Sequence, residues 1–213
     1  MKLLIVESPA KAKTIKGYLD KDFEVVSTVG HIRDLPKKEI GIDENDFSVK
    51  KWEITSANLN PVLNNIKKSD EVFLALDPDR EGEMIAWHLI EVCREENLLE
   101  GKNFKRIEFT AVRKNDILEA LKNPRDINED LVNAAKTRKF LDKFFGYKIS
   151  PITRRRTSTF GKSAGRVQSP TLKILAEREK EIDKFVPEEY WEFLLELKDK
   201  KGNKCNCDLL MDG

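Results

Sequence analysis

The sequence predicts an α/β fold: a doubly wound parallel sheet flanked by helices, then a mostly helical segment, then the start of a β-rich domain. Short apolar runs alternate with amphipathic helical patterns as far as about Lys122, and this alternation is typical of a parallel sheet with helical crossovers. The run 72–76 (VFLAL) has five apolar residues, which is too few for a helix and typical of a strand buried on both faces. We expect three parts, at residues 1–124, 125–187 and 188–213.

Local patterns predict the individual elements. Strands are expected at 3–6, 23–28, 72–76 and 105–109, with an edge strand at 51–55 and later strands at 189–198 and 204–211. Helices are expected at 9–19, 58–68, 81–98, 113–121 and 128–147, and from Ser169 as N-cap with Pro170 at the first position to Lys184. Ser150-Pro151 predicts the start of a separate helical stretch, and residues 33–50 and 154–162 are expected to be loops, the second basic and mobile.

An acidic turn follows the central strand directly. Asp77, Asp79 and Glu81 are spaced two apart, so an extended chain would point all three carboxylates the same way before the helix begins. Two carboxylates about 4 Å apart repel by roughly 4 kcal/mol at an effective dielectric near 20, so the cluster needs a cation or a proton. Oxygen ligands of this kind favour Mg²⁺. The alternative is a solvated acidic turn in which Arg80 pairs with a neighbour.

A second acid stands at the end of the first strand. Glu7 is followed by Ser8 as N-cap and Pro9 as the first helical residue, a well-supported helix start. If the two strands are parallel neighbours, Glu7 and the acidic turn share one edge, where open parallel sheets bind their ligands. His31 follows the next strand at the same edge and is either an ordinary loop histidine or a phosphate contact.

The charge of the chain is unevenly distributed. The totals of 39 basic and 38 acidic residues nearly cancel, so net charge alone implies no partner. Residues 133–173, however, hold eleven Lys or Arg and one acid, which fits a basic surface facing a polyanion. Within this segment Arg138 lies in the apolar stripe formed by Leu131, Ala134, Ala135, Leu141 and Phe145. With Asp142 one turn later, Arg138 is either part of a structural ion pair or an arginine held in place for a phosphate. Arg166 and Gln168 lie beside the next helix N-terminus and suit a phosphodiester or a base edge.

Cysteine usage and hydropathy place the chain in a reducing compartment. There are three cysteines, Cys93, Cys205 and Cys207, without the spacing of a disulfide framework, and a CxC pair alone is weak support for zinc. No stretch approaches the roughly 20 apolar residues of a membrane span. We expect a soluble cytoplasmic protein that does not bind a membrane.

Six collinear motifs cover nearly the whole chain: IVESPAKAKTIKGYL, VGHIRDLP, LALDPDREGEMIAWHL, FLDKFFGYKISP, SAGRVQSPTL and FVPEEYWEF. Together they resemble the N-terminal part of the type IA DNA topoisomerases, which begin with a Toprim domain, a Rossmann-like parallel sheet. The resemblance implies an ATP-independent enzyme that cuts one DNA strand, passes another through the break and religates it, relaxing negatively supercoiled duplex DNA. It implies Mg²⁺ as cofactor, single-stranded DNA as partner and a monomeric state.

The same resemblance implies roles for individual residues. Glu7, Asp77, Asp79 and Glu81 would bind Mg²⁺, and Glu7 would also protonate the leaving sugar hydroxyl. Lys11 would stabilise the phosphate in the transition state, and Asp79 and Arg80 would belong to the same catalytic group. The DNA-binding residues would be His31, Arg138, Asp142, Ser163, Arg166 and Gln168, and residues 154–162 would be disordered until DNA binds.

Two departures from the family pattern stand out. Members often carry Glu after the strand at 105–109, where this chain has Thr110-Ala111-Val112, so a helper acid there is absent or supplied elsewhere. The nucleophilic tyrosine of the family lies on a later domain, and none of Tyr18, Tyr147 and Tyr190 lies in that motif. We therefore expect part of a longer enzyme that binds metal and DNA without cleaving. A Toprim nuclease or primase, a non-catalytic single-strand-binding module and an aspartyl phosphatase remain the alternatives.

Overall fold

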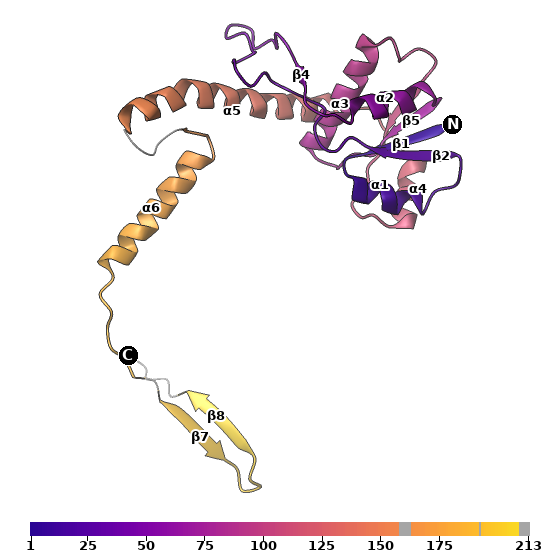
Figure 1. The fold of residues 1–213 in the computed structure, drawn as a ribbon. Helices are drawn as coiled ribbons and strands as arrows, with labels where there is room; N and C mark the ends of the chain where they lie inside the picture. Colours follow the sequence, from indigo (N-terminus) through magenta and orange to yellow (C-terminus); the bar gives the residue numbers. More distant parts are fainter. Residues whose placement is uncertain (158–162, 192, 209–213) are drawn as a thin grey trace. The chain divides into compact units, whose positions relative to one another are not determined.

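The computed structural model describes residues 1–157, 163–191 and 193–208, in two compact units of residues 1–166 and 167–213. The first unit contains a parallel four-stranded sheet in the order β2-β1-β5-β6 (Figure 1). Its strands are β1 (Lys2–Val6), β2 (Phe23–Ser27), β5 (Glu71–Leu74) and β6 (Asn103–Arg106). The chain starts in the middle, moves outward to β2 and returns to β5 on the other side of β1. The predicted α/β class with a doubly wound parallel sheet is confirmed.

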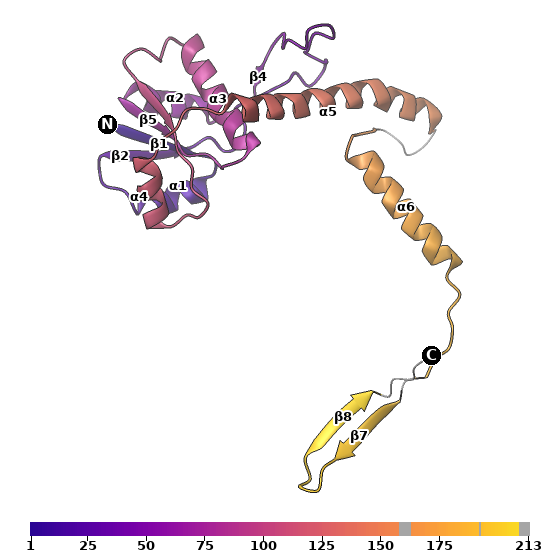
Figure 2. The same ribbon diagram turned by 180° about the vertical axis from the view of Figure 1, so that it is seen from behind.

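Alternating residues of the strands face two different layers of helices. Leu3 and Ile5 point into a core shared with α2 (Leu59–Lys67) and α3 (Arg80–Glu95). Leu4 and Val6 point into a second core shared with α1 (Pro9–Lys16) and α4 (Lys114–Lys122). This is the period of two expected of a strand buried on both faces, and the views from the two sides show one pair of helices on each face (Figures 1 and 2). The sheet is therefore held rigidly from both sides.

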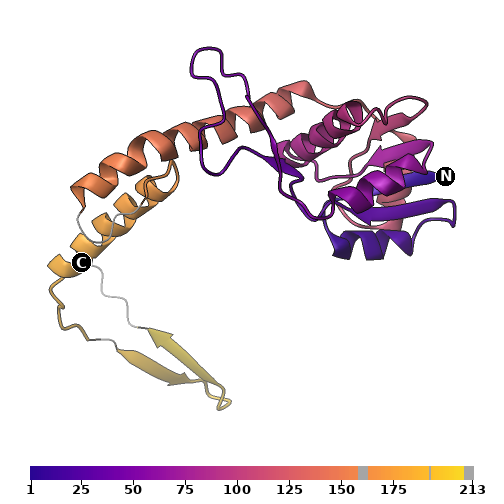
Figure 3. The same ribbon diagram turned by 45° about the horizontal axis from the view of Figure 1, so that its top comes forward.

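A long loop leaves the sheet after β2. Its base is a two-stranded antiparallel pairing of β3 (Arg33–Asp34) with β4 (Glu53–Ile54), and we call the residues between these strands, 35–52, the strap. The predicted polar loop at 33–50 is only partly correct, because Arg33 and Leu35 are buried and Ile42 pairs with Val49. The strap crosses over the long helix α5 (Figure 3).

Helix α5 (Glu129–Arg156) is one continuous helix of 28 residues. Asn128 caps it by accepting hydrogen bonds from the backbone N–H groups of residues 130 and 131 at 3.0 and 3.1 Å. The prediction of a separate helix starting at Ser150-Pro151 is wrong, because Pro151 lies inside α5, and Arg154, Arg155 and Arg156 form its last turn rather than a loop. The rest of that predicted loop, residues 158–162, lies outside the described residues.

The predicted apolar stripe of α5 is only partly buried. Val132 and Ala135 pack against Met84 of α3, whereas Leu141 is 53% exposed. Only the first turns of α5 meet α3, so the apolar residues further along the helix have no core to enter. The stripe correctly predicts that this segment is a helix, but it does not correctly predict which face of the helix is buried.

The second unit contains α6 (Gln168–Lys184) and a hairpin of β7 (Leu194–Lys198) with β8 (Lys204–Asp208). Val167, not Ser169, is the residue before the first helical turn, so α6 begins two residues earlier than predicted. Strand β7 begins five residues later than predicted, and residues 209–211 of the other predicted strand lie outside the described residues. Within the part of the chain that the structure describes, no helix is both long and apolar enough to cross a bilayer.

A buried histidine makes the stability of the first unit dependent on pH. His88 of α3 is fully buried against the rings of Trp52 and Trp87, at centroid distances of 4.5 and 5.0 Å. Neither ring nitrogen has a hydrogen-bond partner among the described residues, and burial lowers the pKa of His88 from 6.5 to about 3. His88 is therefore a neutral core residue.

We predict that His88→Phe removes a component of acid destabilisation. Below pH 6.5 the unfolded chain binds a proton at residue 88 that the folded chain does not bind until about pH 3, so folding free energy is lost as pH falls, by up to about 1.4 kcal/mol per pH unit. Urea unfolding at pH 7, 6, 5 and 4 should show wild type losing more stability than His88→Phe. Parallel pH curves for the two proteins would contradict a buried neutral His88.

Candidate metal and nucleic-acid site

Two acidic positions meet where the sheet reverses its strand order. Glu7 follows β1 and Asp77 follows β5, and these strands are paired neighbours, with Ile5 opposite Leu74. Because the chain proceeds from β1 in one direction to β2 and in the other to β5, the crevice between β1 and β5 is the topological switch point of the sheet. The predicted common edge of Glu7 and the acidic turn is confirmed.

The carboxylates of Glu7 and Asp77 influence each other directly. Burial first, and then the neighbouring Asp77 carboxylate, raise the pKa of Glu7 above its ordinary value, while the Lys11 ammonium opposes the rise. Lys11, from the first turn of α1, forms an ion pair with Asp77. The result is a half-buried group of two acids and one cation, in which Glu7 holds a proton more readily than an ordinary glutamate.

Asp79 and Glu81 point to different partners. Asp79 is the N-cap of α3, and its Oδ1 accepts a hydrogen bond from the Gly82 N–H at 2.7 Å. Glu81 already lies in the first turn of α3, so it departs from the expected extended arrangement of three parallel carboxylates. Among the described residues, no three Asp, Glu, His or Cys side chains are placed to hold a metal ion. Glu7 and Asp77 still match the preference of Mg²⁺ for one or two carboxylates completed by water and phosphate.

Glu81 connects the acidic turn to His31 and to α5. Its two oxygens lie 3.2 Å from His31 Nε2 and 3.2 Å from Arg138 Nη1. Burial and the nearby Lys139 ammonium lower the pKa of His31, although Glu81 counteracts them. His31 and Arg138, 107 residues apart in the sequence, are thus held at the same carboxylate.

Asp142 lies between two arginines. Arg138 Nε is 3.8 Å from Asp142, and Arg166 donates from Nε and Nη2 at 2.7 and 3.3 Å. The hydrogen bond from Arg166 is the main reason that the pKa of Asp142 lies below its ordinary value. All three side chains are about 40% exposed, so these ion pairs are weak and a phosphate can replace Asp142 as the partner at little cost.

These groups surround one open cavity of about 520 Å³, which we call the acidic cavity. Its lining consists of Glu7, His31, Asp77, Asp79, Glu81, Arg138, Lys139 and Asp142. Lys139 was not predicted as a site residue, although its position next to Arg138 in the sequence was an available signal. It forms an ion pair with Asp34 at 3.0 Å. Of the other predicted residues, Lys11, Arg80 and Arg166 each pair with an acid of the lining. Ser163 is exposed in the loop before α6, and Gln168 is the first residue of α6 in the second unit.

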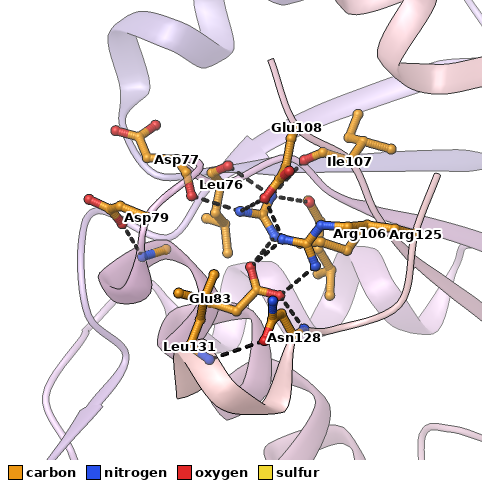
Figure 4. A network of polar contacts seen from close by, with 12 residues as sticks. Leu76, Asp77, Asp79, Glu83, Arg106, Ile107, Glu108, Arg125, Asn128 and Leu131 are labelled. Carbon is orange, nitrogen blue, oxygen red and sulfur yellow. Dashed lines mark hydrogen bonds and ion pairs between the residues drawn. The ribbon is translucent and has the colours of Figure 1, made fainter. Parts of the chain in front are cut away.

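A buried arginine fixes the backbone beneath the acidic turn. Arg106, at the end of β6, is fully buried and donates hydrogen bonds to four carbonyl oxygens (Figure 4). The acceptors are Leu74, Leu76, Asp77 and Ile107, at 2.9, 2.8, 2.7 and 2.6 Å. Because the carbonyl of Asp77 is among them, the side chain of Asp77 is free to face the cavity while its backbone is held.

Glu83 balances the charge of Arg106. Its fully buried carboxylate accepts from Arg106 Nε at 3.0 Å, from Arg125 at 2.7 Å and from the Asn128 N–H at 2.7 Å. These hydrogen bonds outweigh burial and keep the pKa of Glu83 below its ordinary value. The network joins the first turn of α3 to the start of α5. The place of Glu83 in the acidic motif was the available sequence signal, but it does not reveal which residues Glu83 contacts.

An acid closer to the strand than residues 110–112 follows β6. The strand ends at Arg106, three residues earlier than predicted, so the acid that follows it is Glu108 rather than a residue at 110–112. Glu108 forms an ion pair with Arg125 and lies 4.0 Å from Arg106. Glu108 is not among the residues that line the acidic cavity, so the expectation that a helper acid is absent or supplied elsewhere stays a prediction.

The basic segment is largely engaged within the protein. Lys136 lies over the Trp87 ring and Lys139 pairs with Asp34 of β3. Two further cations hold the strap, Lys143 on the Pro36 carbonyl and Lys148 on Glu44. The predicted basic surface is therefore smaller than the residue count suggests. The cations that line or border the acidic cavity remain the best candidates for contact with a polyanion.

Comparison with known proteins agrees with this geometry. Residues 2–112 match the Toprim domain model and residues 126–209 match the model described as DNA topoisomerase. The chain belongs to the bacterial type IA DNA topoisomerase family. It is 44% identical to DNA topoisomerase 1 of Rickettsia felis over 206 residues, covering 95% of this chain and 26% of that protein. It is 47% identical to DNA topoisomerase 1 of Xylella fastidiosa over 193 residues, covering 89% of this chain and 23% of that protein.

A solved relative has the same fold. The structure of full-length topoisomerase I from Thermotoga maritima matches with a TM-score of 0.74 and 39% identity, over 99% of this chain and 35% of that one. This type IA chain thus spans about a quarter of the length of the curated relatives it matches. The match beyond residue 126 distinguishes it from proteins that share only a Toprim domain.

We predict that Gly82→Ala destabilises the first unit by about 2–3 kcal/mol. A Cβ atom at this position would lie 2.2 Å from the Asp77 carbonyl oxygen, so the acidic turn must move away from α3. Gly146→Ala is the matched control: it is also helical and has open space around it, and alanine should stabilise α5 by about 0.5–1 kcal/mol. Urea unfolding of both variants tests this, and equal effects would contradict the close approach at Gly82.

We predict that Arg106→Leu costs about 3–5 kcal/mol of unfolding free energy, because it removes one partner of the buried Glu83 carboxylate and one donor from each of four carbonyls. Arg94→Leu, which removes an exposed ion pair with Glu91, should change stability by no more than about 0.5 kcal/mol. Thermal unfolding followed by circular dichroism compares the two. A mild effect of Arg106→Leu would show that the network is dispensable.

Proposed function

We propose that this chain supplies the Mg²⁺-binding and single-strand-holding half of a type IA topoisomerase active centre. In the longer enzyme it would take part in Mg²⁺-dependent cleavage of one DNA strand, passage of another strand and religation, which relaxes negative supercoils. The observation that carries the proposal is the acidic cavity, in which Glu7 and Asp77 at the sheet edge face Arg138 and Lys139 of α5. A phosphodiester between them would meet metal-binding carboxylates on one side and cations on the other.

Glu7 and Asp77 are the residues best placed to hold Mg²⁺, with Asp79 and Glu81 bordering the same cavity. When bound there, the ion would neutralise charge on the scissile phosphate as a Lewis acid. The raised pKa of Glu7 supports a role as general acid, because a glutamate that holds its proton more readily than usual is better suited to transfer it to the leaving sugar oxygen. Lys11, paired with Asp77, would add positive charge beside the phosphate, and Arg80 a further one at the rim.

The strand would be held by cations that now contact carboxylates. Arg138 contacts Glu81 and Asp142, and Arg166 contacts Asp142, so phosphates would take over donors that are already oriented. His31 at Glu81 would contact the strand at the sheet edge. Roles for Ser163 and Gln168 rest on the motif they belong to, and the extent of the three proposed parts, 1–124, 125–187 and 188–213, rests on the sequence pattern.

The covalent step would need a tyrosine other than those of this chain. The Tyr147 hydroxyl donates to the Lys37 carbonyl at 2.6 Å, and Tyr18 packs against the core beside α1. Tyr190 belongs to the second unit, where it is 76% exposed. We infer that this chain by itself binds metal and DNA and does not cleave, and that it acts as a monomer in the cytoplasm.

We predict that the purified chain neither nicks nor relaxes negatively supercoiled plasmid in the presence of Mg²⁺, while it binds single-stranded DNA more tightly than duplex. Arg138→Ala should weaken single-strand binding roughly 10-fold and lower the slope of log affinity against log salt by about 0.7. Fluorescence anisotropy with a labelled oligonucleotide at several salt concentrations measures both effects.

Arg94→Ala, an exposed arginine of α3 outside the acidic cavity, is the control and should leave affinity and slope nearly unchanged. Relaxation by the purified chain would refute the inference about the tyrosine. An unchanged affinity of Arg138→Ala would refute the proposed path of the strand.

A further inference from the structure

A second cavity lies on another side of α5, away from the acidic cavity. Its volume is about 480 Å³, and we call it the aromatic cavity. Its lining comes from the strap (Phe47, Ser48, Val49 and Trp52), from α3 (Trp87) and from α5 (Asn133, Lys136, Thr137 and Phe140). The helical positions 133, 136, 137 and 140 form one face of α5, whereas Arg138 and Asp142 of the acidic cavity lie on another. The two cavities therefore share the helix and none of their lining residues.

The lining of the aromatic cavity differs in charge from that of the other cavities. Of the described residues that form it, none is acidic, and Lys136 is the charged one. Three further cavities formed by the described residues, of about 210, 430 and 520 Å³, contain carboxylates, among them Glu91 in the first, Glu108 in the second and Glu7 in the acidic cavity. In a chain in which 36% of the residues are charged, an acid-free cavity with one lysine favours an anionic ligand.

The walls of the aromatic cavity are rigid. Trp52 and Trp87 meet edge to face at 6.3 Å, and both rings also contact the buried His88. Lys136 Nζ lies 3.6 Å from the centroid of the Trp87 ring, so the ammonium is positioned by a cation–π contact. Burial lowers the pKa of Lys136 below its ordinary value, and the nearby Glu129 and Glu91 carboxylates oppose this shift.

Phe47 at the rim is held in a costly conformation. Its φ is 59°, in the left-handed region that a bulky side chain rarely adopts, and its side chain is 58% exposed. Its ring contacts Phe144 edge to face at 6.1 Å. If the aromatic side chains served only to anchor the strap, burying Phe47 would be favourable. An exposed ring in a strained backbone position is instead suited to cover a ligand.

We propose that the aromatic cavity binds an unpaired base of single-stranded nucleic acid, with Lys136 next to the adjoining phosphate. Flat aromatic walls accept any base by stacking, and a single cation among them supplies the charge complementarity that such sites use. This site is separate from the strand path proposed above, because neither Arg138 nor any other residue that lines the acidic cavity lines the aromatic cavity. It would hold a second strand segment, or a distant part of the same strand.

The test uses the fluorescence of the two cavity tryptophans. The chain has three tryptophans, so in the Trp191→Phe protein only Trp52 and Trp87 emit. This protein is titrated with a short oligothymidylate and with an abasic oligonucleotide of the same length and charge. We expect quenching by the oligothymidylate with clearly higher affinity than by the abasic strand. Phe47→Ala and Lys136→Gln should each weaken oligothymidylate binding roughly 10-fold.

Lys105→Gln is the matched control, because Lys105 also lies over an aromatic ring, 5.7 Å from the centroid of Phe73, outside the aromatic cavity. It should alter the affinity less than about twofold. Thermal unfolding confirms that Phe47→Ala, which alters an exposed side chain, is folded. Equal binding of the intact and abasic strands, or unchanged binding by both cavity variants, would overturn the proposal.

The two proposed sites fail in different ways. Arg138→Ala should weaken the intact and abasic strands alike, because its partner is a phosphate, whereas Phe47→Ala should weaken only the intact strand. If Arg138→Ala alone had no effect on binding, the strand path at the acidic cavity would be overturned. If Phe47→Ala alone had no effect on binding of the intact strand, the base-binding site would be overturned.

Discussion

The buried pair of Arg106 and Glu83 is the interaction on which the geometry of the acidic cavity depends. Both side chains are fully buried, and breaking such a pair from one side is costly because the remaining charge has no solvent. Arg106 gathers the carbonyls at the end of β5, and Glu83 fixes the first turn of α3 and the start of α5. The acidic turn is therefore clamped through its backbone, and its carboxylates remain available to the cavity.

This clamp allows repelling charges to stay close together. Glu7 and Asp77 face each other at the switch point, and the raised pKa of Glu7 reflects the cost of that arrangement. Lys11 from α1 reduces the repulsion without removing it, and Arg138 from α5 pairs with the neighbouring Glu81. Under the proposed function, a site with negative charge on the sheet and exposed, exchangeable cations on the helix would receive a metal ion and a phosphate together.

The parts of this structure that could be predicted are those set by local sequence. Strands, helices and the common edge of Glu7 and Asp77 follow from apolar runs, the Ser8-Pro9 cap and the rules for parallel sheets. The contacts of Glu83 with Arg125 and of Lys139 with Asp34 span 42 and 105 residues, and no local pattern specifies such partners. Pro151 shows the opposite limit: its local signal favours a break, yet α5 continues through it, because a helix N-terminal to the proline is already formed and propagates.

Helix α5 separates two kinds of chemistry in one unit. Its Arg138 face meets the carboxylates of the sheet edge, and its Lys136 face meets the indoles that the strap and α3 provide. Further cations of α5 hold other parts of the first unit: Lys139 pairs with Asp34 of β3, and Lys143 and Lys148 hold the strap. A count of basic residues overstates the free positive surface for this reason: most cations of α5 already have a fixed partner. What the helix offers to nucleic acid is accordingly a few oriented cations beside two differently lined cavities, rather than a uniform basic surface.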